Sequence, residues 1–214
     1  AADYVLHDVS FQVHQGETVA FIGSTGSGKS TLARLMIGLE RPSEGRVLIN
    51  GVDTTKWGLR EWRKYRGKIQ AVFQDAGGTL NPSWSTSKNV EEALVNLTDL
   101  SPSQRKNRIA ELMEQTGLSK SLLDTPVRKL SGGEQRRLAL LRSLSISPEF
   151  LILDEVTAGL DLISTEAVLQ LLEKYEQEHD CAYLVITHDL QVASRLCEVI
   201  YEIEHGKFTK KAVR

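Results

Sequence analysis

The stretch that decides the fold runs from residue 23 to residue 31 and reads Gly23-Ser24-Thr25-Gly26-Ser27-Gly28-Lys29-Ser30-Thr31. It fits the phosphate-binding pattern G-x-x-x-x-G-K-[ST] at every fixed position. A short apolar run at 19–22, typical of a buried strand, precedes it, and a helix-forming segment at 32–37 follows and stops at Gly38. A strand, a glycine loop and a helix in this order form the geometry that a triphosphate needs.

Each part of this loop has a role in holding phosphate. The glycines let backbone N–H groups approach the phosphate oxygens, and the helix N-terminus adds positive partial charge at the same place. Lys29 is expected to reach the β- and γ-phosphates, and the Ser30 hydroxyl to ligate Mg²⁺. The alternative is a glycine-rich turn that only caps a helix, and the flanking strand and helix disfavour it.

Length and composition set further bounds. The 214 residues include 41% hydrophobic and 25% charged side chains, which predicts a soluble globular protein with a sizeable core. The formal net charge is -2 and no long basic run occurs, so nothing calls for nucleic acid as a partner. Cys181 and Cys197 are too far apart for a zinc motif and fit a reducing compartment. We find no signal peptide or bilayer-spanning stretch, which favours a cytosolic protein.

The order of strand and helix signals favours an α/β fold with a parallel sheet. The segment around 5–13 shows partial β alternation, and strands are predicted at 45–49 before the turn Asn50-Gly51, at 69–73 and at 150–153. The range 86–123 is helical, with a start at Ser101-Pro102 and an end at Gly117. A helix at 163–178, a strand at 182–186, a helix at 189–196 and a strand at 199–203 complete the alternation.

The run at 150–153 ends in two carboxylates, Asp154 and Glu155. A carboxylate at the end of a buried strand beside a phosphate-binding loop can hold Mg²⁺, directly or through water. Glu155 comes one residue later, points elsewhere, and is the natural general base for an attacking water. The alternative is that this acidic pair only caps the next turn. The neighbouring phosphate loop disfavours that interpretation.

A second glycine loop reads Leu130-Ser131-Gly132-Gly133-Glu134-Gln135. A small hydroxyl and two glycines precede a helix that is expected to begin near Glu134, which again forms an anion site. One nucleotide needs only one glycine cradle, so this second loop is interpreted as serving the nucleotide of another copy. Ser-x-x-Glu is also a capping box, and both readings can hold together.

Together these motifs resemble those of the ATP-binding cassette (ABC) ATPases. Leu130–Gln135 is similar to their signature motif, Gln74 to the Q-loop glutamine, Asp161 to the D-loop aspartate and His188 to the switch histidine. Each of the last three alone would more often be an ordinary polar residue, so their order and spacing carry the weight. The resemblance covers residues 1–214 as a single ABC ATPase domain. It implies a P-loop NTPase (RecA-like) core, an N-terminal antiparallel β subdomain and an α-helical subdomain inserted at about 80–145.

The resemblance also implies a dimer that encloses two ATP molecules. Each site would join the phosphate loop of one chain to Ser131, Gly132 and Gly133 of the other, and Asp161 would contact the opposite chain. Because Glu155 and His188 are both present, the site is expected to hydrolyse ATP. The predicted catalytic residues are Glu155, His188 and Gln74; the predicted Mg²⁺ ligands are Ser30, Gln74 and Asp154; the predicted nucleotide-binding residues are Gly23, Ser24, Thr25, Gly26, Ser27, Gly28, Lys29, Ser30, Thr31, Ser131, Gly132, Gly133 and Asp161.

A finer resemblance links the chain to oligopeptide, dipeptide and nickel importers. Val72-Phe73-Gln74-Asp75 followed by Leu80-Asn81-Pro82 is similar to their ATPases, and the segment 39–45 and Asp161-Leu162 are similar to the nickel-import members. This implies a motor bound peripherally at the cytoplasmic face of the cell membrane. Its partners would be a second ABC ATPase (the same chain or a paralogue), integral-membrane permease subunits and, indirectly, an extracytoplasmic substrate-binding protein. The transported substrate, peptide or nickel or metal chelate, is left open.

Three features depart from the family pattern. The family usually stacks adenine on an aromatic residue upstream of the phosphate loop; Tyr4 is the nearest such residue, although it lies close to the loop. Val156 and Gly159 replace the usual proline and alanine, and the glycine is expected to loosen the D-loop backbone. The chain stops at Arg214 without the long extension of many peptide importers, which favours the shorter nickel-type relatives or a shortened chain.

Two other classes of protein share parts of these features. A soluble ABC ATPase of DNA repair or translation would have the same nucleotide site, but would usually carry two cassettes or a long coiled coil, and this chain has no sustained heptads. A P-loop kinase or GTPase would explain Lys29 and Ser30, but neither the second glycine loop nor His188.

Overall fold

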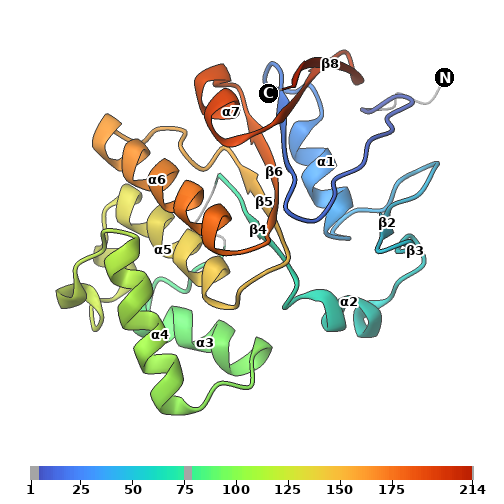
Figure 1. The fold of residues 1–214 in the computed structure, drawn as a ribbon. Coiled ribbons are helices and arrows are strands. Elements are labelled where there is room, and N and C mark those ends of the chain that lie inside the picture. Colours follow the sequence, from blue (N-terminus) through green and yellow to red (C-terminus); the bar gives the residue numbers. More distant parts are fainter. Residues whose placement is uncertain (1–4, 75–78, 214) are drawn as a thin grey trace. The chain divides into compact units, whose positions relative to one another are not determined.

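A six-stranded sheet is the central element of the computed structural model, which describes residues 5–74 and 79–213 (Figure 1). Its strand order is β4-β5-β6-β1-β7-β8. β1 pairs in parallel with β6 and β7, β5 pairs in parallel with β6, and β8 closes one edge antiparallel to β7. The bounds are β1 Thr18–Ile22, β4 Ile69–Val72, β5 Phe150–Asp154, β6 Ala182–Thr187, β7 Val199–Glu204 and β8 Lys207–Val213. The predicted α/β fold with a parallel sheet is confirmed.

Burial and register explain why this sheet can carry a site. β1 and β6 are buried at every position, as expected for central parallel strands with continuous apolar runs. The register sets Ile22 opposite Thr187, and Asp154 opposite Ile186. The loops that follow β1, β5 and β6 therefore all leave the sheet at the carboxyl ends of its parallel strands, which is where open α/β sheets bind ligands.

The chain forms two compact units. The first unit contains residues 1–71, 149–155 and 180–214, and with them the sheet apart from Val72 and the helices α1 (Lys29–Met36), α2 (Leu59–Tyr65) and α7 (Leu190–Leu196). The second unit contains residues 72–148 and 156–179, and with them α3 (Thr86–Leu97), α4 (Pro102–Gln115), α5 (Gly132–Ser145) and α6 (Leu162–Glu178). Helices α3 to α5 fall in the range 80–145, for which an inserted helical subdomain stays a prediction.

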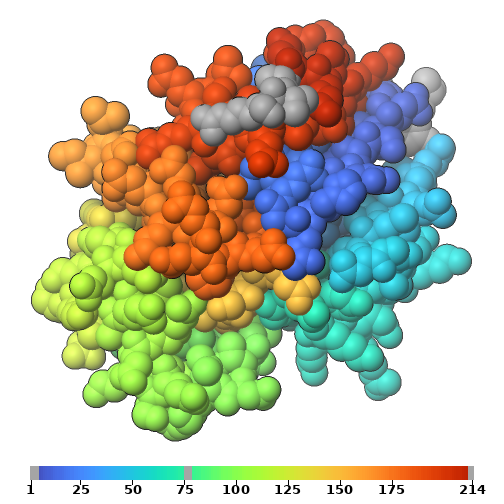
Figure 2. Space-filling view, viewed as in Figure 1, coloured from blue at the N-terminus to red at the C-terminus, as the bar shows by residue number. Residues whose placement is uncertain are grey.

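Helices α3, α4 and α5 of the second unit pack around fully buried side chains, among them Leu94, Leu112 and Leu141. Ser101 caps α4 as predicted. Its hydroxyl accepts a hydrogen bond from the Gln104 backbone N–H, and the Gln104 side-chain oxygen accepts one from the Ser101 backbone N–H. The outer face of α4 is exposed and forms much of the yellow-green surface in Figure 2. Two short 3₁₀ turns, Lys120–Leu122 and Val127–Lys129, lead from α4 to α5.

The N-terminal segment differs from the sequence prediction. Residues 5–17 contain no strand, and among the strand pairs whose register is described, the antiparallel ones are β7–β8 and the short hairpin of β2 (Leu48–Ile49) and β3 (Val52–Asp53). The alternating side chains in 5–17 still pack, since the Phe11 ring lies 4.8 Å from that of Phe21 and 5.8 Å from that of Phe208. Packing against the sheet, without a hydrogen-bond ladder, thus explains this alternation.

Two turns have the mirror-image geometry that favours tight hairpins. Asn50 and Gly51 have φ angles of 50° and 77°, which confirms the predicted turn after a strand that is shorter than expected. His205 and Gly206, with φ angles of 48° and 72°, join β7 to β8 in the same way. The sequence analysis missed β8, although this dipeptide between two strand-like segments is its signal.

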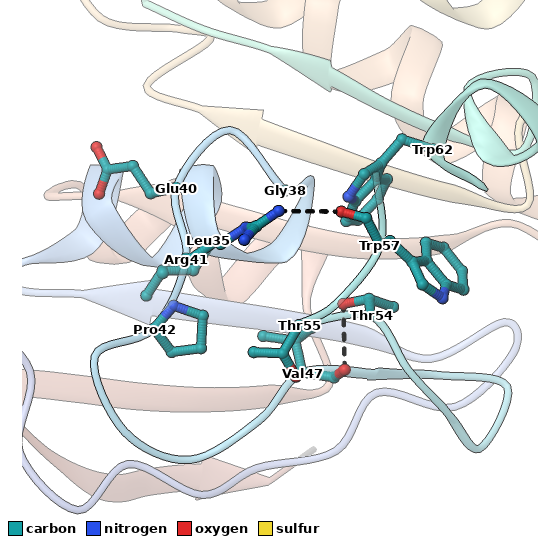
Figure 3. A pocket seen from close by; sticks show the side chains of 10 residues that line it. All are labelled: Leu35, Gly38, Glu40, Arg41, Pro42, Val47, Thr54, Thr55, Trp57 and Trp62. Atoms are coloured by element: carbon teal, nitrogen blue, oxygen red, sulfur yellow. Dashed lines mark hydrogen bonds between the residues drawn. The ribbon is translucent and has the colours of Figure 1, made fainter. Parts of the chain in front are cut away.

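A close contact joins the end of α1 to α2, a helix that the sequence analysis also missed. Gly38 follows α1 with a φ of 71°, and the indole of Trp62 lies against it in a small pocket whose wall includes Leu35 and Pro42 (Figure 3). A Cβ atom at Gly38 would overlap the Trp62 ring. The start of α2 is fixed by Glu61, whose carboxylate accepts from the Gly58 N–H at 2.9 Å.

This contact predicts that Gly38→Ala destabilises the protein by at least about 2 kcal/mol, since it combines a left-handed backbone with overpacking. Gly45→Ala is the matched control: its φ is 80°, but a Cβ there meets nothing within 4 Å, so only the backbone cost of about 1 kcal/mol remains. Urea unfolding of both variants measures the difference. Equal losses would mean that the Trp62 contact contributes nothing.

Candidate functional site

The phosphate-binding loop connects β1 to α1 in the first unit, as the sequence predicts. Gly28 precedes the helix with a φ of 101°, a conformation that favours glycine, and no side chain caps the N-terminus of α1. No acidic residue lies in the first turn of α1. No acidic side chain of this first turn therefore competes with a bound anion for the positive end of the helix dipole.

Lys29 lies across this loop. Its ammonium donates to the carbonyl oxygens of Gly23 at 2.7 Å and Ser24 at 2.8 Å, and the residue is 7% exposed. Burial lowers the pKa of Lys29, while the carboxylates of Glu155 and Asp154 act in the opposite direction. The loop thus holds a buried cation on its own carbonyls, next to the place where a phosphate would add negative charge.

Asp154 ends β5 and supplies an acceptor that no group of the described residues uses. The residue is 4% exposed, and its Oδ1 is buried without a hydrogen-bond partner, as is the hydroxyl of Ser27 in the loop. Burial raises the pKa of Asp154, and a hydrogen bond from the Ser30 side chain opposes that rise. A buried carboxylate oxygen with a free lone pair beside a serine hydroxyl is a donor set that fits Mg²⁺.

This donor set is small by itself. In the described part of the chain, no group of three or more His, Cys, Asp or Glu side chains could hold a metal ion. Magnesium sites for nucleotides commonly use only one or two protein oxygens, and substrate phosphates and waters supply the rest. Ser30 and Asp154 therefore fit a cation that arrives with a nucleotide.

Glu155 points to a different partner from Asp154. Its φ of 52° is a strained value for a glutamate, held in place by a 2.8 Å hydrogen bond from its N–H to the Ile186 carbonyl. Its carboxylate oxygens lie 2.9 and 3.0 Å from Nδ1 of His188, which follows β6. The Glu155 side chain is 13% exposed and that of His188 67%. The structure thus brings these two predicted catalytic residues together, with a carboxylate able to accept a proton.

The second glycine loop begins α5 in the second unit. Ser131 caps the helix: its hydroxyl accepts from the Glu134 N–H, and the Glu134 carboxylate accepts from the Ser131 N–H at 2.8 Å. The capping box is therefore confirmed, and the helix starts at Gly132, two residues before the predicted position. A Cβ on Gly133 would lie 3.5 Å from Leu160 and 3.6 Å from Ser164, so this loop adjoins the start of α6.

Asp161 and Gln74 also belong to the second unit. The Asp161 carboxylate caps α6 by accepting from the Ser164 N–H at 2.9 Å and its hydroxyl at 2.8 Å, and these bonds lower the pKa of Asp161. The carbonyl of Gln74 accepts from Arg136. The contact of Asp161 with an opposite chain and the role of the Gln74 side chain stay predictions.

Other residues singled out in the sequence have plainer outcomes. Tyr4, the nearest aromatic residue for an adenine platform, lies outside the described residues. Val156 is buried, and Gly159 has a φ of 73°, which fits a glycine in the D-loop. Cys181 and Cys197 are both buried, and burial raises the pKa of Cys181 to about 12. A buried thiol with a raised pKa is not a reactive thiolate, so Cys181 is not such a site.

A contact at the phosphate loop was not predicted from the sequence. A Cβ on Gly28 would lie 2.7 Å from Cδ2 of Leu6 and 3.2 Å from Cγ1 of Val5. The side chains of Val5 and Leu6 therefore border the loop where α1 begins. Only folding brings these residues together with Gly28, and no local sequence pattern signals the contact.

Comparisons with known proteins place this geometry in a family. The family model described as ABC transporter matches residues 6–158. The nickel import ATP-binding protein NikE of Brucella suis biovar 1 (strain 1330) is 38% identical over 207 residues, which are 97% of this chain and 78% of that protein. NikE of Escherichia coli (strain K12) is 37% identical over 209 residues, 98% of this chain and 78% of that protein.

Solved structures agree with these matches. The dimeric ATP-binding cassette MJ0796, in a post-hydrolysis state with ADP and Pi, has a TM-score of 0.91 and 32% identity over 99% of this chain and 91% of its own. The structure of cbiO1 from Clostridium perfringens, part of the ABC transporter complex cbiONQ, has a TM-score of 0.83 and 30% identity over 96% and 80% of the two chains.

A strand, glycine loop and helix beside two carboxylates and a histidine define a P-loop nucleotide hydrolase. The chain belongs to the ABC transporter family, and it is an ATP-binding cassette with ATPase activity. The resemblance inferred from the sequence motifs is thereby confirmed. Across residues 5–74 and 79–213, none of the helices has the length and apolar character needed to cross a bilayer.

The open acceptor on Asp154 predicts that Asp154→Asn stabilises the nucleotide-free protein by about 1 kcal/mol at neutral pH, because a buried charge is removed. The raised pKa of Asp154 means that the folded protein keeps this proton to a higher pH than the unfolded chain. The gain is therefore largest above the folded pKa and shrinks as the pH falls toward the ordinary value of 3.8.

Thermal or urea unfolding between neutral and acid pH measures this difference. Asp53→Asn is the control of opposite sign, since hydrogen bonds from Thr55 lower the pKa of Asp53, so that its carboxylate favours the folded state. A loss of stability in Asp154→Asn at neutral pH would show that the Asp154 carboxylate is already satisfied without a cation.

Proposed function

We propose that this chain is the ATP-hydrolysing motor subunit of an ABC importer for peptides, nickel or metal chelates. It would act as a nucleotide-sandwich dimer, with a second copy or a paralogue, on integral-membrane permease subunits. The similarity to nickel import ATP-binding proteins over nearly the whole chain supports the importer assignment. The similarity to a part of the transporter complex cbiONQ supports a permease partner.

The observation that carries the catalytic part is the cluster at the edge of the sheet. Lys29, Asp154 and the Glu155–His188 pair lie at the ends of β1, β5 and β6, which the register brings to one edge. Lys29 would exchange the carbonyls of Gly23 and Ser24 for phosphate oxygens when ATP binds. The remaining residues from Gly23 to Thr31 would surround the phosphates with backbone N–H groups and hydroxyls.

Each role in ATP hydrolysis would then fall to a particular side chain. The Glu155 carboxylate would accept a proton from the attacking water, and His188 would hold that water and the terminal phosphate in place. Ser30 and Asp154 would hold Mg²⁺, which supplies charge neutralisation of the phosphates when bound. Gln74 as a further metal ligand, and as the relay to the permease, rests on the order of the motifs.

The second glycine loop completes the proposal. Ser131, Gly132 and Gly133 would contact the nucleotide of the partner cassette, and Asp161 would contact the partner chain. The existence of a dimeric relative with bound ADP and Pi supports this arrangement. ATP binding would close the dimer and hydrolysis would reopen it, which is a population shift that the permease reads. The chain would accordingly work peripherally, at the cytoplasmic face of the membrane.

The role of Glu155 predicts that Glu155→Gln lowers the ATP turnover number at least about 100-fold, because the amide cannot act as a general base. ATP binding is expected to persist, and the stalled protein is expected to accumulate as a dimer in size-exclusion chromatography with ATP. Glu149→Gln, at an exposed glutamate paired with Lys68, is the control and is expected to retain turnover. Full activity of Glu155→Gln would remove this residue as the base.

The role of the second loop predicts that Ser131→Arg blocks ATP-dependent dimer formation while the nucleotide affinity of the single chain stays within about twofold of wild type. Light scattering with ATP measures the first quantity, and fluorescent-nucleotide titration the second. Ser101→Arg is the matched control, since it removes the same kind of capping box from α4. A large loss of affinity in the single chain would mean that the loop serves its own nucleotide.

Association with a permease tests the importer assignment itself. The full chain is purified by affinity from gently solubilised native membranes, and the proteins that accompany it are identified by mass spectrometry. Two permease subunits and a cassette partner are the expected result, and an associated binding protein would narrow the substrate class. Recovery only from the soluble fraction, with ribosomes or DNA-repair proteins, would overturn the importer assignment and leave the ATPase chemistry intact.

A further inference from the structure

One side chain of α5 reaches two loops of the second unit at once. Nη1 of Arg136 donates to the carbonyl oxygen of Ala158, and Nη2 donates to the carbonyl oxygen of Gln74 at 3.3 Å. Gln74 is the predicted Q-loop residue, and Ala158 lies three positions before Asp161 in the predicted D-loop. The helix that carries Arg136 begins at Ser131–Gly133. Three segments with separate predicted roles therefore meet at a single guanidinium group.

The chemistry of the contact favours positioning over simple charge pairing. Both acceptors are backbone carbonyls, so each bond fixes a main-chain position. The guanidinium is a rigid plane, and its donors hold the two carbonyls at a fixed separation. Nε of Arg136 is buried without a hydrogen-bond partner, which is unfavourable. The conformation that makes the two carbonyl contacts therefore does not satisfy every donor of the guanidinium.

An independent contact joins two of the same segments. The start of α5 adjoins the start of α6, because a Cβ on Gly133 would lie in ordinary contact with Leu160 and Ser164. Ser164 in turn holds the Asp161 carboxylate through its N–H and hydroxyl. The loop before α6 is therefore attached to α5 at two places, by the packing at Gly133 and by the bond from Arg136 to Ala158. Arg136 supplies the attachment of Gln74.

We propose that Arg136 is a positioning residue that makes the backbone at Gln74, the loop around Ala158 and the N-terminal part of α5 move as one body. The inference rests on the proposed function, in which Gln74 relays the nucleotide state, and Ser131–Gly133 and Asp161 contact the partner chain. A displacement of Gln74 would then carry the dimer-facing loops with it. The permease-facing and dimer-facing events would be linked within one chain by two hydrogen bonds.

The next residue along the helix provides a matched control. Arg137 is on the same helix, and its Nη1 donates to the carbonyl of Gly117 at 3.2 Å. Its Nε is also buried without a partner. Both arginines thus lie on α5, and each has only some of its N–H donors in hydrogen bonds. Arg137, however, reaches neither Gln74 nor Ala158. Arg→Lys at each position keeps the positive charge and removes the planar fork.

The test compares Arg136→Lys and Arg137→Lys in the full chain by hydrogen–deuterium exchange and ATPase kinetics. For Arg136→Lys we expect faster exchange in both peptides, the one that contains Gln74 and the one that contains Ala158. We also expect kcat to fall about tenfold while KM for ATP changes less than about twofold, since the phosphate loop is untouched. For Arg137→Lys we expect faster exchange only around Gly117 and a kcat near wild type.

Two outcomes would overturn the proposal. One is unchanged exchange at Gln74 and Ala158 in Arg136→Lys, which would mean that Arg136 does not hold these segments. The other is an equal loss of kcat in both variants with exchange raised throughout α5, which would mean general destabilisation of the helix. The exchange readout needs no transport partner, so it separates a failure of this coupling from a failure of the importer assignment.

Discussion

The burial of a cation and a carboxylate at one edge of a parallel sheet is the constraint on which the rest of this structure depends. Lys29 and Asp154 are 7% and 4% exposed, and each would be costly in an ordinary core. The fold accommodates Lys29 by giving its ammonium two loop carbonyls, and Asp154 by a hydrogen bond from Ser30. It leaves one oxygen of Asp154 without a partner. Strongly buried neighbouring strands hold the loops in place, because β1 and β6 are buried at every residue.

The proposed function accounts for this arrangement. A nucleotide would bring phosphate oxygens for Lys29, and its accompanying cation would use the open acceptor of Asp154. The strained backbone of Glu155 accompanies a different contact, since its carboxylate lies 2.9 Å from Nδ1 of His188. In the proposed function, these two adjacent carboxylates would have different tasks, Asp154 holding the metal and Glu155 accepting the proton.

Much of the fold and the site could be predicted because local chemistry specifies it. The phosphate loop, the strand before Asp154 and the caps at Ser101 and Ser131 each need particular residues at fixed spacing, and the structure has them there. The sequence prediction was wrong where side-chain packing alone produced a pattern, as at Phe11, whose segment packs on Phe21 without pairing as a strand. Contacts between distant segments, such as Leu6 with Gly28 and Arg136 with Gln74, have no local signal. Helix α2 was missed because it is short and has no buried residue.

The most direct test of the account is a crystal structure of the full chain with Mg²⁺ and ATP, stalled by the substitution at Glu155. We expect two chains around two nucleotides, with Lys29 on phosphate oxygens and no longer on the carbonyls of Gly23 and Ser24. We further expect a cation on Ser30 and Asp154, and Ser131 of the other chain against each nucleotide. A nucleotide bound elsewhere, with Lys29 still on its two carbonyls and Asp154 without a cation, would contradict it.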